Sequence, residues 1–226
     1  EAASLNTVFL KDAFENIAAA ARQAPIRAFA AYGPIGEEAF FEGVAAQRPG
    51  LIAAVFPNFG DCLFAGIDGM FEAGCSSACV LNSDTPDLPT DYLLRCAGEL
   101  EGGRDRVVIG PADDGGYYIL GISRPHRRLF ADIEWSTPRV LGQTLARVAE
   151  LGLEVVTLPM WSDIDDAASL GRFVVSMEAG AEARRRRGEA RPFAAPHSSA
   201  HLRASLRETD LRHRLALPAD RRVDAA

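Results

Sequence analysis

Short apolar segments of strand length alternate with amphipathic segments of helix length from residue 26 to residue 177. This alternation predicts a sheet with helices on both faces, because each element has one apolar side to bury. We therefore expect an α/β fold, a three-layer sandwich around a mixed, mostly parallel sheet. The expected strands cover 26–32, 77–81, 106–110, 117–122 and 153–158, with a further short one at 51–56. The expected helices cover 4–23, 37–44, 60–73, 90–100, 138–151 and 166–177.

The segments 106–110 and 117–122 are too close in sequence for a crossover helix to lie between them. Parallel neighbours need such a crossover, so we expect one of these two strands to run antiparallel to the others. The helix at 138–151 carries the clearest end signals. Thr137 is predicted to cap its N-terminus, and Gly152 is predicted to end it.

The length of 226 residues suits one large domain, or one domain with an appendage. The composition changes after residue 179, where four consecutive arginines precede a stretch rich in Pro, Ala, Ser and His. We predict a domain at 1–179 and a partly mobile C-terminal extension at 180–226, with a helix at 200–215.

Charge, hydropathy and the pattern of residues 1–20 argue against three classes of protein. The net charge of −7 disfavours general nucleic-acid binding. No apolar run approaches the roughly 20 residues that a transmembrane helix needs. Residues 1–20 show a helical pattern with acidic side chains rather than the basic start and apolar block of a secretory signal. We therefore expect a cytoplasmic protein.

The first of three acidic motifs is Asn-Ser-Asp-Thr-Pro-Asp at 82–87, directly after the strand at 77–81. Sites in open α/β sheets lie beyond the carboxyl ends of the strands. A carboxylate at Asp84 can hold Mg²⁺ or Mn²⁺, both of which prefer oxygen ligands and bridge phosphate oxygens. The alternative is that Asp84 or Asp87 organises a turn or caps the next helix.

The second motif, Asp113-Asp114-Gly115-Gly116-Tyr117, joins the strands at 106–110 and 117–122. Its glycines allow the backbone to pass close to a ligand or to adopt positive φ. A plain hairpin turn explains the glycines equally well, but it does not require the pair of acids.

The third motif is Asp163-Ile164-Asp165-Asp166, after the last strand. Alternate residues of an extended segment point the same way, so Asp163 and Asp165 can share one face and complete a divalent-metal site. The alternative is that these acids cap the next helix. Trp135 can stack on a base or a sugar, or can serve only as a packing residue beside a helix start.

Four motifs in this order resemble the DUF2064 family, bacterial proteins described as glycosyltransferases of the GT-A (nucleotide-diphospho-sugar transferase) fold. The motifs are Asn-Ser-Asp-Thr-Pro-Asp-Leu-Pro at 82–89, Gly-Pro-Ala-Asp-Asp-Gly-Gly-Tyr-Tyr at 110–118, Trp-Ser-Thr-Pro at 135–138 and Asp-Ile-Asp at 163–165. The resemblance runs from about residue 1 to residue 175. It implies a Rossmann-like sheet, a nucleotide-sugar donor, an acceptor that the sequence does not identify, and a divalent metal, Mg²⁺ or Mn²⁺.

The resemblance also implies roles for single residues. Asp84, Asp163 and Asp165 would hold the metal, and Asp114 would act on the acceptor hydroxyl as the catalytic residue. Residues near the substrate would be Thr85, Asp113, Gly115, Gly116, Tyr117, Trp135 and Ser136. The third motif departs from the Asp-Val-Asp-Thr-Pro that is commoner in relatives. The family also usually starts with a strand and a nucleotide-cradling loop, which we expect to be missing before residue 1.

The leading hypothesis is a metal-dependent glycosyltransferase that uses a nucleoside-diphosphate sugar. A nucleotidyltransferase, joining a nucleoside triphosphate to a phosphorylated small molecule, would use the same acids and the same metal. A non-catalytic binding or scaffold domain is the alternative of a different class. The sequence indicates no oligomeric state.

Overall fold

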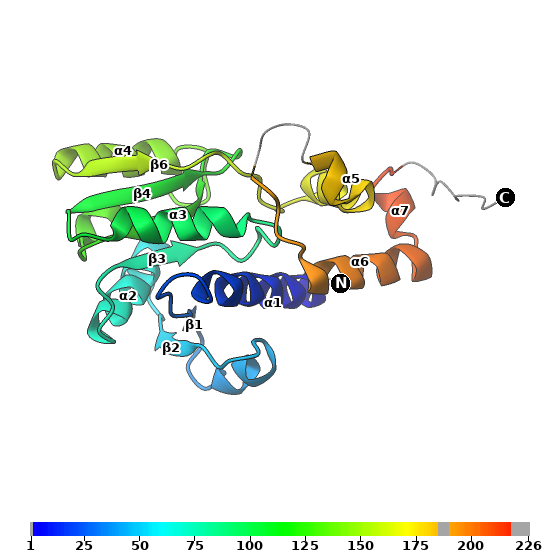
Figure 1. Cartoon of the computed structure of the whole chain (residues 1–226), viewed down its shortest axis with the longest axis horizontal. Helices are drawn as coiled ribbons and strands as arrows, with labels where there is room; N and C mark the ends of the chain where they lie inside the picture. Colours follow the sequence, from blue (N-terminus) through cyan, green and yellow to red (C-terminus); the bar gives the residue numbers. More distant parts are fainter. Residues whose placement is uncertain (1, 185–189, 218–226) are drawn as a thin grey trace.

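The computed structural model describes residues 2–184 and 190–217 of the chain (Figure 1). Its helices are α1 (Ala2–Ala21), α2 (Phe59–Glu72), α3 (Thr90–Leu100), α4 (Val140–Glu150), α5 (Ala167–Arg184), α6 (Pro196–Glu208) and α7 (Leu211–Arg214). Its strands are β1 (Phe29–Tyr32), β2 (Gly50–Ala53), β3 (Ala78–Leu81), β4 (Arg106–Pro111), β5 (Tyr117–Ile122) and β6 (Glu154–Thr157). Two short 3-10 helices are η1 (Glu38–Gly43) and η2 (Arg127–Phe130).

The strands divide between a four-stranded sheet, in the order β3-β5-β4-β6, and a two-stranded parallel sheet of β1 and β2. β5 is antiparallel to both β3 and β4, whereas β6 is parallel to β4. Three of the four strands in the larger sheet therefore run in one direction, and β5 is reversed. The prediction of a mixed sheet with one antiparallel strand near 117–122 is confirmed.

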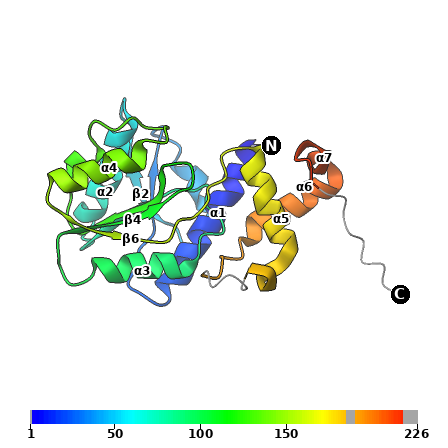
Figure 2. The same ribbon diagram turned by 90° about the horizontal axis from the view of Figure 1, so that it is seen from above.

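Helices cover both faces of the larger sheet, as Figure 2 shows from above. Val107 and Ile109 of β4 belong to an apolar cluster with residues of α2 and α4. Val108, between them, belongs to a second cluster with residues of α1 and α3. This alternation follows from the two-residue period of a strand, and it gives the three layers that the sequence predicts.

The prediction that residues 26–32 join the main sheet is wrong. Within the described chain β1 pairs with β2 alone, and β3 pairs with β5 alone, so no backbone ladder connects the two sheets. α2 packs on β3 and also on β1 and β2, and thus joins the sheets through side chains. As an edge strand β3 is less buried than its apolar sequence suggests: Ala78 is buried, but Cys79, Val80 and Leu81 are half-buried.

α4 begins later than predicted, and Thr137 is not its cap. Arg139 occupies the N-cap position, and no side chain caps the helix there. The Thr137 hydroxyl donates to the carbonyl oxygen of Glu134 and accepts the Arg139 N–H at 3.3 Å, so Thr137 belongs to the turn before the helix. Gly152 does follow the helix, with a φ of 65° that favours glycine. No described helix has both the length and the apolar character needed to cross a bilayer.

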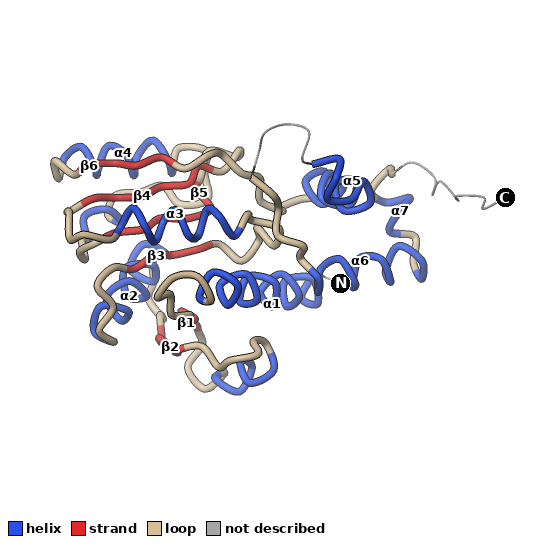
Figure 3. Tube along the Cα trace, viewed as in Figure 1, coloured by secondary structure: helices blue, strands red, loops and turns tan. Residues whose placement is uncertain are grey.

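α6 packs beside the N-terminal half of α1, and α7 follows α6 at its far end (Figure 3). The predicted helix at 200–215 is divided, since α6 ends at Glu208 and α7 begins at Leu211. Side chains from α5, α6 and α7 share an apolar cluster that includes Phe173, Met177 and Leu202. Of the arginine run, Arg185, Arg186 and Arg187 lie outside the described residues, as does the side chain of Arg184. The division of the chain at residue 180 stays a prediction.

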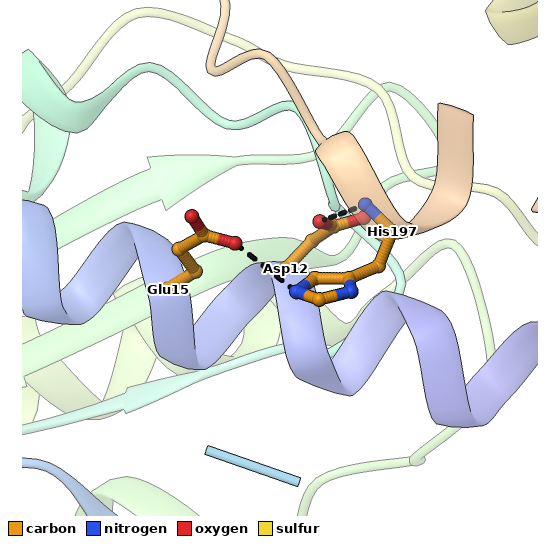
Figure 4. A group of neighbouring side chains, drawn as sticks. All are labelled: Asp12, Glu15 and His197. Carbon is orange, nitrogen blue, oxygen red and sulfur yellow. Dashed lines mark hydrogen bonds and ion pairs between the residues drawn. The ribbon is translucent and has the colours of Figure 1, made fainter. Parts of the chain in front are cut away.

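A buried carboxylate fixes α6 to α1. Asp12 of α1 is fully buried, and it accepts hydrogen bonds from the backbone N–H groups of His197, at 2.9 Å, and Ser198, at 2.8 Å. It also accepts a hydrogen bond from the Ser198 hydroxyl. Glu15, one turn further along α1, pairs at 3.1 Å with the His197 ring (Figure 4). Asp12 thus provides acceptors for free backbone N–H groups in the first turn of α6, which lies 185 residues away in sequence.

We expect Asp12→Ala to lower the free energy of unfolding by about 2–3 kcal/mol, because it leaves buried donors of α6 without partners. Glu15→Ala is the control. It removes only the partly exposed ion pair with His197 and should cost less than about 1 kcal/mol. Urea unfolding of both variants measures the difference. Equal losses would contradict the assignment of Asp12 as the anchor of α6.

Candidate active site

A backbone connection holds the third acidic motif beside the second. After β6 the chain stays alongside the end of β4, where Trp161 forms a parallel bridge with Ala112. The Trp161 N–H donates to the Pro111 carbonyl at 3.0 Å, and the Asp113 N–H donates to the Trp161 carbonyl at 3.2 Å. Because the two segments run parallel, the residues that follow each of them emerge at the same edge of the sheet.

The first acidic motif is attached to the third in the same way. Asp84 lies three residues beyond the end of β3, and its carbonyl oxygen accepts the Ile164 N–H at 3.0 Å. Ile164 stands between Asp163 and Asp165, so this bond places both of these acids close to Asp84. The three loops that the sequence singled out therefore meet at one site.

We call Asp84, Asp114, Asp163 and Asp165 the acid group. One carboxylate oxygen from each of Asp114, Asp163 and Asp165 lies within 4.8 Å of the others, which is a spacing that one cation can bridge. Asp84 is close enough to these three to affect the pKa of Asp163. Among the described residues, none of the four forms an ion pair with a basic side chain.

Burial and mutual repulsion disfavour the charged form of these acids. Burial raises the pKa of Asp163 to about 7, and the neighbouring charges of Asp114 and Asp165 add to the effect. Burial and the charge of Asp165 raise the pKa of Asp84 to about 6. The pKa of Asp165 is raised by burial and then by Asp114. A cation would relieve both causes.

One oxygen of the acid group has no partner in the protein. Asp84 Oδ1 is buried and accepts no hydrogen bond from the described chain. A buried carboxylate oxygen without a partner costs stability. A hard divalent cation such as Mg²⁺ or Mn²⁺ prefers oxygen ligands and would give this oxygen a partner. The residues present therefore fit a divalent cation.

A second set with metal-ligand spacing, Asp12, Glu15 and His197, differs in this respect. Both oxygens of Asp12 already accept hydrogen bonds from the start of α6, and Glu15 pairs with His197. These contacts explain the set as the attachment of α6 to α1.

Asp166 is separate from the acid group although it follows Asp165 directly. Its Oδ1 accepts the Ser169 N–H at 2.7 Å, and the Ser169 hydroxyl in turn accepts from the backbone N–H groups of Asp165 and Asp166. Asp166 therefore caps the first turn of α5. The capping role that the sequence left open for this motif belongs to Asp166, and Asp163 and Asp165 remain available to a ligand.

The second motif is a hairpin turn and also a support for Asp114. The Gly116 N–H donates to Asp114 Oδ1 at 2.7 Å, which orients that carboxylate toward Asp163 and Asp165. Gly115 has a φ of +94°, and a Cβ atom there would lie 2.4 Å from the carbonyl oxygen of Pro138. Only glycine fits this position. The same turn that requires this glycine also places the Asp114 carboxylate.

Two further predicted residues flank the acid group with contacts of their own. Asp113 accepts a hydrogen bond from the Ser162 hydroxyl at 2.8 Å and lies 4.0 Å from the Arg172 guanidinium. Thr85 is buried and donates its hydroxyl to the Asn82 carbonyl within its own loop. Their roles in substrate binding stay predictions.

Three other predicted residues lie outside the acid group. Tyr117 is buried among the side chains between β5 and α4. Trp135 packs edge-to-face on Phe59, with the ring centroids 5.3 Å apart, which is the packing role that the sequence left open. Ser136 is exposed and has a φ of 60°. Contact of these side chains with a substrate stays a prediction.

Sequence reasoning did not single out Trp161 and Ser162, which connect the acidic loops. Trp161 Nε1 donates to the Asp87 carboxylate at 3.1 Å, and its backbone bridges to β4. Their position directly before the third acidic motif was the available signal. Nothing in the sequence pattern indicated which partners they would contact.

The family model for DUF2064, described as an uncharacterized protein conserved in bacteria, matches residues 16–137, more than half of the chain. The chain belongs to the DUF2064 family. No curated protein matches it. The matched DUF2064 range contains Asp84 and Asp114, and the segment with Asp163 and Asp165 lies beyond it.

The fold is similar to that of a solved structure from Desulfovibrio desulfuricans G20, which is described as a "putative nucleotide-diphospho-sugar transferase". The TM-score is 0.74 and the sequence identity is 21%, over 93% of this chain and 84% of the other. This DUF2064 chain therefore has a GT-A-like α/β fold.

The raised pKa values predict how the stability of the metal-free protein varies with pH. The Asp carboxyls of the unfolded chain titrate near 3.8, whereas Asp84 and Asp163 in the folded chain titrate near 6 and 7. Their protonated forms stabilise the fold at low pH, and this contribution is lost as pH rises through 6 and 7. In EDTA, we expect Asp163→Asn to lose less unfolding free energy than the wild type between pH 5 and pH 8. If the unfolding free energies of the two proteins changed with pH in parallel, burial and repulsion would not raise the pKa of Asp163 as assigned.

The close approach of Gly115 to Pro138 gives a second prediction. Gly115→Ala should lower the unfolding free energy by at least about 2 kcal/mol, because the alanine combines an unfavourable φ with a backbone clash. Gly102→Ala is the matched control, since Gly102 has a φ of +85° and no atom near its missing Cβ. It should cost only about 1 kcal/mol. Thermal unfolding of both variants decides; equal losses would show that the Pro138 contact is not tight.

Proposed function

We propose that this protein is a metal-dependent transferase that acts on a nucleoside-diphosphate sugar. The observation that supports the proposal is the acid group: four carboxylates from three loops meet at the carboxyl edge of a GT-A-like sheet, without basic partners among the described residues. Maintaining such a group costs stability in the metal-free protein, which favours a functional explanation over a structural one.

The acid group has the chemistry that such a transfer needs. A divalent cation bound there would neutralise the charge that develops on the leaving diphosphate. In the transfer, the bond from the sugar's anomeric carbon to the diphosphate breaks, a bond to the acceptor oxygen forms, and the acceptor hydroxyl loses its proton. Asp163, Asp165 and Asp84 would supply oxygen ligands to that cation. Asp114 lies in the same group, so it is placed to be a further ligand or to accept that proton.

Supporting side chains keep the acid group in position. The Asp114 carboxylate is oriented by the Gly116 N–H, and the Asp84 loop is attached to Ile164 through its carbonyl oxygen. Arg172, which lies near Asp113, is the basic side chain of α5 at the border of the site. We expect the Arg172 guanidinium to interact with the negatively charged diphosphate of the nucleotide sugar rather than with the acid group.

The products distinguish this proposal from nucleotidyl transfer. Incubation with Mn²⁺ and UDP- or GDP-sugars should release a nucleoside diphosphate if sugar is transferred to an acceptor or to water. Release of pyrophosphate from a nucleoside triphosphate, with no diphosphate released from nucleotide sugars, would favour the nucleotidyltransferase. Absence of any metal-dependent nucleotide binding would contradict both enzymes and favour a binding or scaffold domain.

Neighbouring acids give a sharp test of the metal site. Asp165→Ala should lower Mn²⁺ affinity at least tenfold, because a charged ligand is lost, and should leave the metal-free stability unchanged or higher, because repulsion is relieved. Asp166→Ala should do the reverse: it should cost about 1 kcal/mol through loss of the α5 cap and leave Mn²⁺ affinity within about twofold. Calorimetric titration and urea unfolding measure the two quantities. Similar behaviour of the two variants would contradict the proposed site.

A further inference from the structure

A cavity of about 500 Å³ lies where α3, α5 and α6 meet, outside the acid group. Its walls are the first turn of α3, one side of α5, the segment 191–194 and the first half of α6. The volume falls within the roughly 300–1,000 Å³ of sites that bind small molecules. The space is large enough for a small molecule rather than for a single ion only.

The apolar walls of the cavity are fixed in place. Phe173 and Met177 of α5 are buried in the cluster that joins α5 to α6. Phe193 contributes a half-buried ring from the segment that leads into α6. The Phe193 N–H donates to the Asp87 carbonyl at 3.0 Å, which holds this segment against the loop that carries Asp84. Contacts within the chain therefore hold both α5 and the segment 191–194 at the cavity.

The charged side chains at the cavity favour an anion. Arg191 and Arg203 both line it, and neither forms an ion pair with any residue that the structure describes. Asp91 is the acidic residue among the described lining side chains. The lining side chains thus include two exposed guanidinium groups and one carboxylate, in a chain whose net charge is −7. Guanidinium groups bind carboxylates and phosphates through paired hydrogen bonds.

The hydroxyl groups at the cavity already have partners. Thr90 donates to the Asn16 side chain at 2.6 Å, and Ser199 donates to the Ala194 carbonyl at 3.2 Å. The two guanidinium groups are thus the side-chain donors that remain for a ligand. A ligand that fits combines an anionic group for the arginines with an apolar part for the aromatic walls.

Two segments of the chain connect the cavity wall to the acid group. The Ile164 side chain packs in the same cluster as Phe173 and Met177, while its neighbours Asp163 and Asp165 belong to the acid group. On the other side, the loop with Asp84 leads directly into Thr90 and Asp91 at the cavity. The chain therefore links the cavity wall to the acid group through two segments.

We propose that this cavity binds the acceptor of the transfer, and that the acceptor is a small amphipathic anion with a carboxylate or phosphate group. The assignment of an acceptor rests on the proposed function; the anion site itself does not. The anionic group binds Arg191 and Arg203, and the apolar part packs on Phe173, Met177 and Phe193. The part of the molecule that receives the sugar extends past the loop toward the acid group.

Calorimetric titration of the protein in EDTA tests the site with phenyl phosphate and phenylacetate as the anionic probes and benzyl alcohol as the neutral one. We expect both anions, or the one that the acceptor resembles, to bind at least tenfold more tightly than the alcohol. Arg191→Ala/Arg203→Ala should lower the affinity for the bound anion at least tenfold. Arg207→Ala, which removes the same charge one turn further along α6, should leave it within twofold. Ala194→Trp, which fills the cavity, should abolish binding.

The outcomes separate this inference from the proposed function. If neither anion binds, or if the double variant binds as well as the wild type, the cavity is not an anion site, whatever the protein does with nucleotides. The acceptor role also requires that the folded double variant keeps wild-type affinity for UDP- or GDP-sugar in Mn²⁺. Arginine-dependent binding of an anion in a protein that binds no nucleotide sugar would overturn the acceptor role and leave a separate anion site.

Discussion

The structure of the site depends on the parallel bridge between the end of β4 and the segment after β6. Carboxylates repel one another, and burial raises the cost of their charge, so these acids would separate if their loops were free. The bonds between Trp161 and Pro111, Trp161 and Asp113, and Ile164 and Asp84 prevent this, because they are backbone bonds that a change of side-chain rotamer cannot release. The sheet thus holds together charges that the protein without a cation disfavours.

Local patterns predicted the parts of the fold that depend on nearby residues. The helix at 90–100 and the strand at 117–122 have the predicted bounds, because hydrophobic period and flanking turn residues determine them. Sheet membership depends instead on which edges meet in space. The apolar run 77–81 suggested a buried strand, yet β3 is a partly exposed edge strand, and β1 and β2 form a separate sheet. Apolar character alone does not distinguish these cases.

The candidate site was predictable to a similar extent. Asp84, Asp114, Asp163 and Asp165 were recognisable because acids that follow strands converge at one edge of an α/β sheet. The sequence did not show which acid of 163–166 caps α5, because the capping role of Asp166 depends on its hydrogen bond with Ser169. The Asp12 contact to Ser198 spans 186 residues and could not be read from either segment. The cavity was equally unpredictable, because α3 and the segments that line it with α3 lie far apart in sequence.

Diffraction from crystals grown with Mn²⁺ and a nucleoside diphosphate would test the metal site most directly. The protein should show an anomalous Mn²⁺ peak at roughly 2.0–2.4 Å from oxygens of Asp163, Asp165 and at least one of Asp84 and Asp114, with diphosphate oxygens completing the coordination. An anomalous peak at Asp12, Glu15 and His197 instead, or none at the acid group with the nucleotide bound, would contradict the account.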